Sequence, residues 1–182
     1  MASLDPNFHQ ETSSLHSEHE DLLKRLDQLD TALEQIVCYS EIFTDLATAN
    51  QAMSQGKWIA EWLPKHYAHE ETTVLEMIAR MSPELASFAR EMKRQHGELR
   101  VRLENFRDHI SHVGEQRDLE AAVAELKREG KDLTRMMRLH VAVEEKKFTD
   151  LETDAQGRPL GPRTALQIRP ISKNSSVHKN FL

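Results

Sequence analysis

The chain has 182 residues, enough to bury the core of one domain without help from disulfides. Charged residues make up 30% of it and aromatic residues 5%, with six glycines and six prolines, and this composition favours an all-α protein over a β-rich one. The formal charge is −6, and because residues 155–182 hold five basic and no acidic side chains, the remainder carries −6 − 5 = −11, which argues against nucleic acid as a partner.

The first predicted helix covers residues 12–37, where apolar residues recur at intervals of three, four or seven. This spacing is typical of a helix with one face turned toward neighbouring helices. The apolar stripe consists of Leu15, Leu22, Leu26, Leu29, Leu33 and Ile36. His19 fills the gap between Leu15 and Leu22, so an imidazole is expected on the buried face. Residues 38–40 interrupt the pattern.

The second predicted helix covers residues 41–81, with irregularities expected at Gly56 and Pro64. Its stripe contains His66 and, four residues later, Glu70. Both occupy places where a helical bundle would normally have leucine or isoleucine. The second helix therefore also carries polar side chains on its buried face.

The third predicted helix begins at the Ser-Pro-Glu sequence of residues 82–84. A hydroxyl cap, a proline in the first turn and an acidic residue all suit a helix N-terminus. This helix carries His96 in its stripe. The fourth predicted helix covers residues 116–151 and has His140 and Glu144 in its stripe. Each of the four helices thus brings a histidine to its buried face.

The chain is expected to have three parts: an N-terminal extension at residues 1–11, a bundle at residues 12–152, and a basic, flexible tail at residues 153–182. Gly130 is expected to weaken the fourth helix. The single cysteine, Cys38, suits a reducing compartment because it can form no internal disulfide. The chain shows no signal peptide and no apolar run of the roughly 18 residues that suggest a membrane span. A cytoplasmic protein without a membrane partner is therefore expected.

The two halves of the chain repeat one another. Each half has a helix with one histidine in its stripe, followed by a helix with a His-x-x-x-Glu-Glu motif. A shift of 77 residues aligns the first pair of helices, and a shift of 74 aligns the second pair. The matching residues are His19 and His96, His66 and His140, and Glu70 and Glu144.

The spacing of these residues points to a metal site. Residues four apart share one face of a helix and lie about 6 Å apart along its axis, so each His-x-x-x-Glu pair offers a nitrogen and an oxygen to one point. A carboxylate buried alone costs several kcal/mol unless it is protonated, paired or bound to a metal, and no lysine or arginine shares the stripes at this level. Imidazole with carboxylate favours iron, manganese or zinc over calcium or magnesium.

On these residues the chain resembles the hemerythrin-like family, whose domains are also called HHE cation-binding domains. The resemblance covers roughly residues 12–152 and follows the order H, HxxxE, H, HxxxE. It implies an up-and-down antiparallel four-helix bundle that holds two iron ions joined by an oxo or hydroxo bridge, with zinc or manganese as alternatives. The ligands that it implies are His19, His66, Glu70, His96, His140 and Glu144.

The chain departs from the oxygen-carrying hemerythrins of invertebrates, which use five histidines, two of them four apart on the third helix. Here Met92 and Arg100 stand four residues before and after His96. Reversible oxygen carriage is therefore not expected. Tyr39 is a candidate additional ligand, since a phenolate can replace an imidazole on ferric iron. Trp58 and Trp62 are expected to pack in the core. Four residues adjoin the motifs and are expected either to orient ligands or to face solvent: His16, His69, Glu71 and Glu145.

The donor set leaves a coordination position open for a small ligand. Together with the resemblance, this suggests a protein that senses, binds or detoxifies dioxygen, nitric oxide or peroxide, in a stress response or in iron–sulfur repair. The alternative is a non-catalytic metal-binding or iron-sensing module that acts through a protein partner. The sequence does not decide between these hypotheses or show whether a substrate is turned over. It is compatible with a homodimer but specifies no interface.

Overall fold

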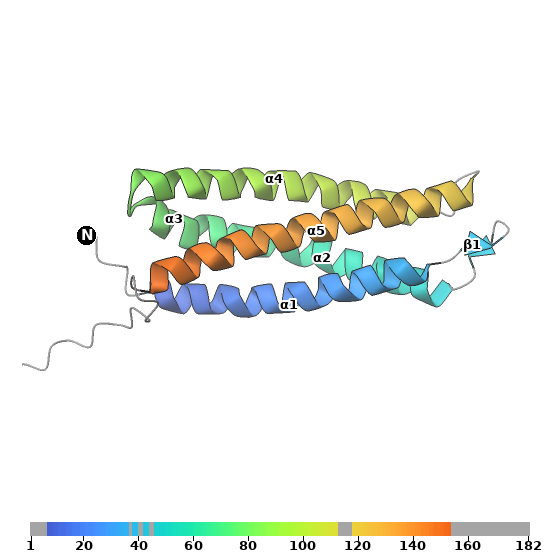
Figure 1. The fold of residues 1–182 in the computed structure, drawn as a ribbon, viewed down its shortest axis with the longest axis horizontal. Coiled ribbons are helices and arrows are strands. Elements are labelled where there is room, and N and C mark those ends of the chain that lie inside the picture. Colours follow the sequence, from blue (N-terminus) through green and yellow to red (C-terminus); the bar gives the residue numbers. More distant parts are fainter. Residues whose placement is uncertain (1–6, 37, 40–41, 44–45, 113–117, 154–182) are drawn as a thin grey trace, which may run out of the picture.

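The computed structural model describes residues 7–36, 38–39, 42–43, 46–112 and 118–153, and most of them are helical. Four long helices run along one common axis (Figure 1): α1 (Phe8–Gln35), α2 (Leu46–Thr72), α4 (Pro83–His112) and α5 (Leu119–Glu152). A six-residue helix, α3 (Val74–Ala79), follows α2. Two short strands, β1 (Cys38–Tyr39) and β2 (Ile42–Phe43), pair in antiparallel fashion. The predicted all-α bundle is confirmed.

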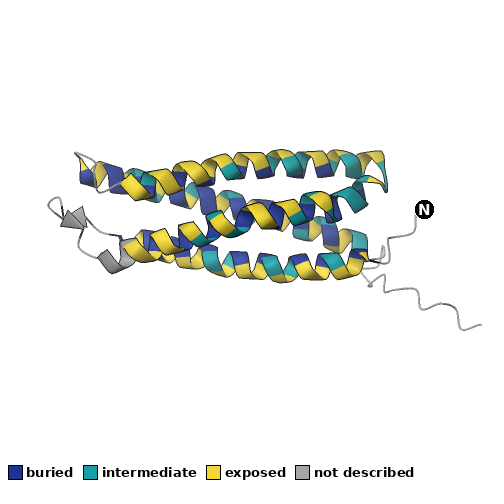
Figure 2. Ribbon diagram, turned by 180° about the vertical axis from the view of Figure 1, so that it is seen from behind, coloured by how far each residue is buried: buried dark blue, intermediate teal, exposed yellow. Residues whose placement is uncertain are grey.

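Each long helix packs against the next along the chain, and the ring closes where α5 packs against α1. The chain therefore runs up and down the bundle, as four helices joined by short connections do. Buried residues line the inner faces of the helices, and exposed residues line the outer faces (Figure 2). All six residues of the apolar stripe predicted on the first helix are buried.

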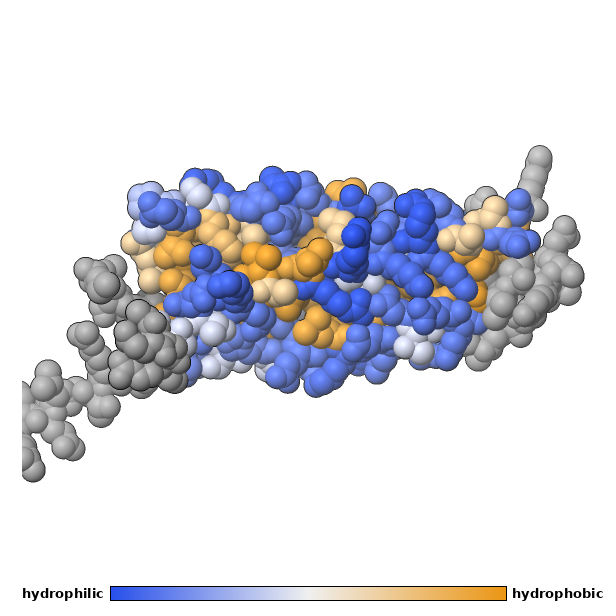
Figure 3. Space-filling model, viewed as in Figure 1, coloured by the Kyte–Doolittle hydropathy of each residue, from blue (hydrophilic) through white to orange (hydrophobic). Residues whose placement is uncertain are grey.

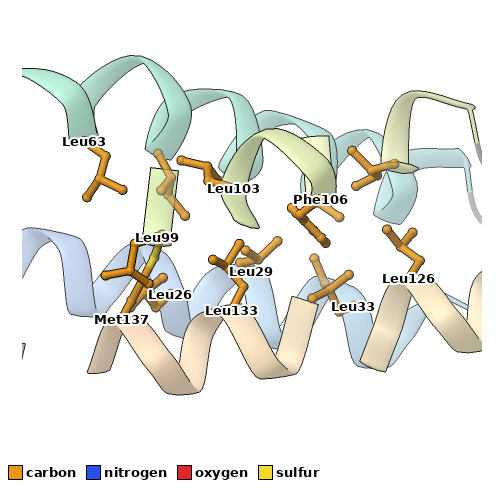
Figure 4. Close-up of a cluster of buried hydrophobic side chains, with 14 of the residues drawn as sticks. Leu26, Leu29, Leu33, Leu63, Leu99, Leu103, Phe106, Leu126, Leu133 and Met137 are labelled. Carbon is orange, nitrogen blue, oxygen red and sulfur yellow. The ribbon is translucent and has the colours of Figure 1, made fainter. Parts of the chain in front are cut away.

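The core consists of two hydrophobic clusters, one toward each end of the bundle. The larger cluster contains Leu29, Leu33, Phe106 and Leu126 and is shown in Figure 4. The smaller cluster includes residues from α1, α3, α4 and α5; among them are Phe8, Leu15, Val74, Met92 and Phe148. On α1, Leu15 belongs to the smaller cluster and Leu22 to the larger one, so His19 lies between them. A polar layer therefore separates two apolar ones.

Helix boundaries differ from the sequence-based expectation at the starts of α1 and α2. Helix α1 begins at Phe8, four residues before the predicted start, and Phe8 is itself a buried core residue. Helix α2 begins at Leu46 instead of residue 41, because Ile42–Phe43 forms a strand. The β-branched and aromatic residues there favour extended backbone.

The break after α2 falls at Thr73, and not at Gly56 or Pro64, both of which lie inside the continuous helix. Thr73 leaves the helical region with φ −115° and ψ −84°. Its hydroxyl donates a hydrogen bond of 2.5 Å to the carbonyl of His69, four residues earlier. Bonds of this kind often bend helices, and this one lies at the break.

Helix α5 runs through Gly130 without the predicted weakening, and Gly130 is buried. A Cβ atom at this position would lie 2.3 Å from Cδ1 of Leu33 and 3.0 Å from Cε2 of Phe106. The absence of a side chain therefore lets α5 approach α1 and α4 closely.

The face of the molecule in Figure 3 is mainly hydrophilic, with hydrophobic seams between helices. None of the helices in the described ranges is long and apolar enough to cross a membrane. The predicted tail, apart from Thr153, lies outside the described residues, so its flexibility stays a prediction.

Candidate metal centre

The six predicted ligands meet in the polar layer between the two hydrophobic clusters. Their exposed fractions are only 0–4%, so the layer is closed to bulk solvent. All four long helices contribute to it. The ligands are His19 on α1, His66 and Glu70 on α2, His96 on α4, and His140 and Glu144 on α5.

Glu70 lies between histidines of three helices. Its Oε1 is 3.1 Å from Nε2 of His19 and 3.3 Å from Nε2 of His66. Its Oε2 is 3.2 Å from Nε2 of His96. The two oxygens of one carboxylate thus face different imidazoles, which is the arrangement that a bridging ligand requires.

Glu144 is placed in a related way from the other side of the bundle. Its Oε2 is 3.4 Å from Nε2 of His140 and 3.6 Å from Nε2 of His19. Its Oε1 is 3.6 Å from Nε2 of His96. Each glutamate therefore reaches three of the four imidazoles.

Two sets of these side chains place one donor atom each within 4.8 Å of one another, as a metal ion requires. Position A is formed by His19, His66 and Glu70. Position B is formed by Glu70, His96, His140 and Glu144. Because Glu70 belongs to both sets, the two positions are adjacent and share a carboxylate.

The donor atoms fit a metal better than they fit one another. Five buried side-chain atoms in the described residues have no hydrogen-bond partner, although several lie within about 3.6 Å of an oppositely polarised atom. Each such atom costs about 1–3 kcal/mol if it stays unsatisfied. The five are Oε2 of Glu70, Nε2 of His96, Nε2 of His140, and Oε1 and Oε2 of Glu144. Coordination to cations would satisfy all five.

The two glutamates titrate in opposite directions. Burial raises the pKa of Glu144, and the nearby charge of Glu70 adds to this, to about 7. Burial also favours protonation of Glu70, but the imidazoles of His19 and His96 outweigh it and lower the pKa of Glu70 below its ordinary value. Like charges so close together are tolerated only with a proton or a cation between them.

The histidines also differ. Burial opposes the charged form of His19, but the carboxylates of Glu145 and Glu70 raise its pKa to about 10. The carboxylates of Glu144 and Glu70 likewise overcome burial and raise the pKa of His96 to about 9. In contrast, burial and the positive charge of His96 lower the pKa of His140 to about 3. The layer therefore already attracts positive charge without a metal.

Each ligand histidine donates a hydrogen bond from Nδ1 to a side chain on a neighbouring helix, which leaves Nε2 to face the centre. Partners of this kind fix the orientation of metal-binding imidazoles and raise their basicity. The pairs are His19 with Glu145 at 2.5 Å, His66 with Glu18 at 2.7 Å, His96 with Glu71 at 2.9 Å, and His140 with Gln95 at 3.0 Å. We call these four side chains the outer partners.

Sequence reasoning left the roles of Glu71 and Glu145 open, and it missed Glu18 and Gln95. A signal for the missed pair exists, because each directly precedes the stripe histidine of its helix. The residue before a ligand lies on the side of its helix, close to the adjacent helix. It can therefore contact the ligand that the adjacent helix carries.

His16 and His69 lie beside the outer partners and not at the donor atoms. Nδ1 of His16 contacts Glu145, and Nδ1 of His69 is 3.5 Å from Glu18. The expectation that these histidines orient the site indirectly is therefore consistent with their contacts. The side chain of Tyr39 lies outside the described part of the chain, so its proposed role as a ligand stays a prediction.

Aromatic rings cover two of the ligands. The ring of Trp62 stacks on His66 with centroids 4.5 Å apart, and Trp58 stacks on Trp62 at 5.2 Å. Tyr67 stacks on His96 at 3.8 Å. Both tryptophans pack half-buried against the larger cluster, as predicted, but they also form a wall of the site.

A bundle with a buried layer of imidazoles and carboxylates defines the class of helical proteins that bind metal ions between facing helices. The family model described as "Hemerythrin HHE cation binding domain" matches residues 10–151 of the chain. The chain therefore belongs to the hemerythrin HHE cation-binding domain family. Comparisons with curated proteins and with solved structures gave no significant match.

Proposed function

We propose that the protein holds two iron ions at positions A and B and uses them to bind a small oxidant or gas, namely dioxygen, nitric oxide or peroxide. The observation that carries this proposal is the set of buried donor atoms without hydrogen-bond partners, all on residues of position B, together with the adjacent position A, which shares Glu70 with it. Iron bound there would supply a redox-active centre that accepts such ligands.

The number of donors supports an open site. Four imidazole nitrogens and four carboxylate oxygens give eight donor atoms, whereas two six-coordinate ions offer twelve positions. Position A, with two histidines and one carboxylate, matches the donor set of non-haem iron(II) proteins that keep positions free for a small molecule. The remaining positions are available to solvent or to an external ligand.

The enclosure of the site limits the size of that ligand. The six side chains are almost fully buried, and Trp62 and Tyr67 cover two of the imidazoles. A molecule with two non-hydrogen atoms can enter such a layer through small fluctuations of the helices, but a larger substrate cannot. This favours a gas or peroxide over an organic substrate.

The test uses the full chain, loaded anaerobically with ferrous iron. We expect a change in the visible and electron paramagnetic resonance spectra with at least one of dioxygen, nitric oxide and hydrogen peroxide. His96→Ala should abolish the response, whereas His109→Ala should retain it, because His109 pairs with Glu129 away from the site. Two bound irons without a response to any of the three ligands would contradict the proposal.

That negative result would favour the alternative, a non-catalytic iron-sensing module. Its signature is a melting temperature and helical content that rise on iron binding, since metal binding to the native state alone stabilises that state. Circular dichroism with and without iron measures both quantities.

A further inference from the structure

The internal repeat that builds the ligands extends to the outer partners. Glu71 and Glu145 each follow a ligand glutamate, and Glu18 and Gln95 each precede the stripe histidine of their helix. The repeat thus matches Glu71 with Glu145, which are identical, and Glu18 with Gln95, which differ in charge. The repeat therefore gives each metal position two histidines, but the side chains around those histidines differ in charge.

Both histidines of position A donate a hydrogen bond from Nδ1 to a carboxylate. Between α1 and α5, Glu145 accepts from His19 and also contacts His16, whose Nε2 is 3.8 Å from Oε2 of Glu152. These outer side chains are partly buried, with exposed fractions of 18–32%. The hydroxyl of Thr12 also donates to Glu152, at the outer end of this chain of contacts.

The second histidine of position A has a matching arrangement between α1 and α2. Glu18 accepts from His66 at 2.7 Å and lies 3.5 Å from Nδ1 of His69. Nε2 of His69 is in turn 3.0 Å from Glu11. In the described residues, neither contact chain of position A includes a lysine or arginine, so the carboxylate charge beside this position is not balanced by a fixed cation.

Position B is surrounded differently. Glu71, which accepts from His96, also accepts from the guanidinium of Arg100 at 3.2 Å. Its negative charge is therefore balanced. The partner of His140 is Gln95, a neutral amide, which donates to Glu91 at 2.8 Å.

We propose that the two positions are inequivalent, and that position A takes the first iron ion and holds the ferric ion when the pair is oxidised by one electron. This inference rests on the proposed di-iron function. Unbalanced carboxylates make the imidazoles of position A more basic and attract a cation of higher charge. At position B, the carboxylate of Glu71 is paired with Arg100 and Gln95 is neutral, so these side chains raise the basicity of the imidazoles less and attract a cation less strongly.

The tryptophans provide a readout for position A. The chain has two tryptophans, and the one nearest a ligand, Trp62, stacks on His66 of that position. In an anaerobic titration with ferrous iron, we expect most of the fluorescence quenching to occur with the first ion per chain. Calorimetry on the same sample should resolve two binding steps of different affinity.

Isotope order tests where the ferric ion lies. One equivalent of ⁵⁷Fe(II) is added first, and one equivalent of ⁵⁶Fe(II) follows. One equivalent of ferricyanide then takes one electron and becomes ferrocyanide, leaving one Fe(II) and one Fe(III) per chain. The Mössbauer spectrum, which detects ⁵⁷Fe alone, should show mainly a ferric signal. A mainly ferrous signal would overturn the assignment.

Two isosteric substitutions exchange the outer charges. Glu18→Gln should lower the affinity of the first step by about 10–100-fold, the usual effect of losing such a partner. Gln95→Glu should raise the affinity of the other step, so that quenching no longer saturates at the first ion. Glu61→Gln, an exposed carboxylate on α2, serves as the matched control and should change neither step.

The outcomes separate this inference from the function on which it rests. Two equal binding steps, with quenching in proportion to both ions and no effect of either substitution, overturn the inequivalence but leave a di-iron protein. Binding of fewer than two ions per wild-type chain overturns both.

Discussion

A substitution that weakens the metal site should strengthen the metal-free protein. Glu144 lies fully buried beside the charged Glu70, and the structure offers Glu144 no hydrogen bond without a metal. Glu144→Gln keeps the shape of the side chain and removes its charge. It therefore removes an unfavourable interaction from the metal-free protein and a ligand from the metal-bound protein.

The magnitude follows from the pKa of Glu144, which burial and Glu70 raise to about 7 from an ordinary value of 4.5. A carboxyl with a raised pKa in the folded state contributes stability below pH 4.5 and loses it as pH rises through 7. At 1.36 kcal/mol for each pH unit, the ionised side chain costs about 3 kcal/mol at pH 8. At pH 5 the cost is less than about 1 kcal/mol.

Urea denaturation in the presence of a chelator measures the effect. We expect metal-free Glu144→Gln to be more stable than the wild type by about 3 kcal/mol at pH 8 and nearly equal to it at pH 5. With iron the order should reverse. The exposed Glu61→Gln should differ from the wild type by no more than about 1 kcal/mol throughout. A metal-free Glu144→Gln protein that is less stable than the wild type at pH 8 would refute the reasoning.

Two further predictions concern protons and packing. His19 and His96, whose pKa values are raised to about 10 and 9, are both protonated at pH 7.5, so binding of two ferrous ions should release about two protons and strengthen as pH rises. Calorimetry in buffers of different ionisation enthalpy counts these protons, and a count of zero would contradict the protonated state of these two histidines in the metal-free protein. Gly130→Ala should cost about 1–3 kcal/mol of unfolding free energy, because its Cβ would lie 2.3 Å from Leu33. Gly97 lies on an exposed helix face, and no atom lies within 4 Å of a Cβ added there. Gly97→Ala should therefore raise the unfolding free energy by up to about 1 kcal/mol. If urea denaturation gave the same change for Gly130→Ala and Gly97→Ala, the close approach at residue 130 would be contradicted.

The inner layer of the site could be predicted from the sequence because helical periodicity determines which side chains share a face. His66 and Glu70 are four apart in an apolar stripe, and the same pair recurs in the second half of the chain. Any four helices that bury these stripes together must bring the polar side chains to one level. The fold class follows from the same stripes.

The outer partners depend on how each helix is rotated about its own axis, which a stripe defines only coarsely. Glu18 and Gln95 lie on the edges of their helices, and only the packed bundle shows that each accepts from a histidine of the next helix. The break at Thr73 was missed for a similar reason. The break lies at a threonine whose hydroxyl bonds to the backbone, whereas Pro64, the stronger helix breaker by propensity, remains inside α2.

The most direct test of the account is the number of iron ions bound per chain, measured by elemental analysis after anaerobic loading. The wild type should hold two ions. His140→Ala combined with Glu144→Ala should lose most of the bound metal, and His109→Ala should keep two. Retention of two ions by the double variant would contradict the assignment of the metal centre.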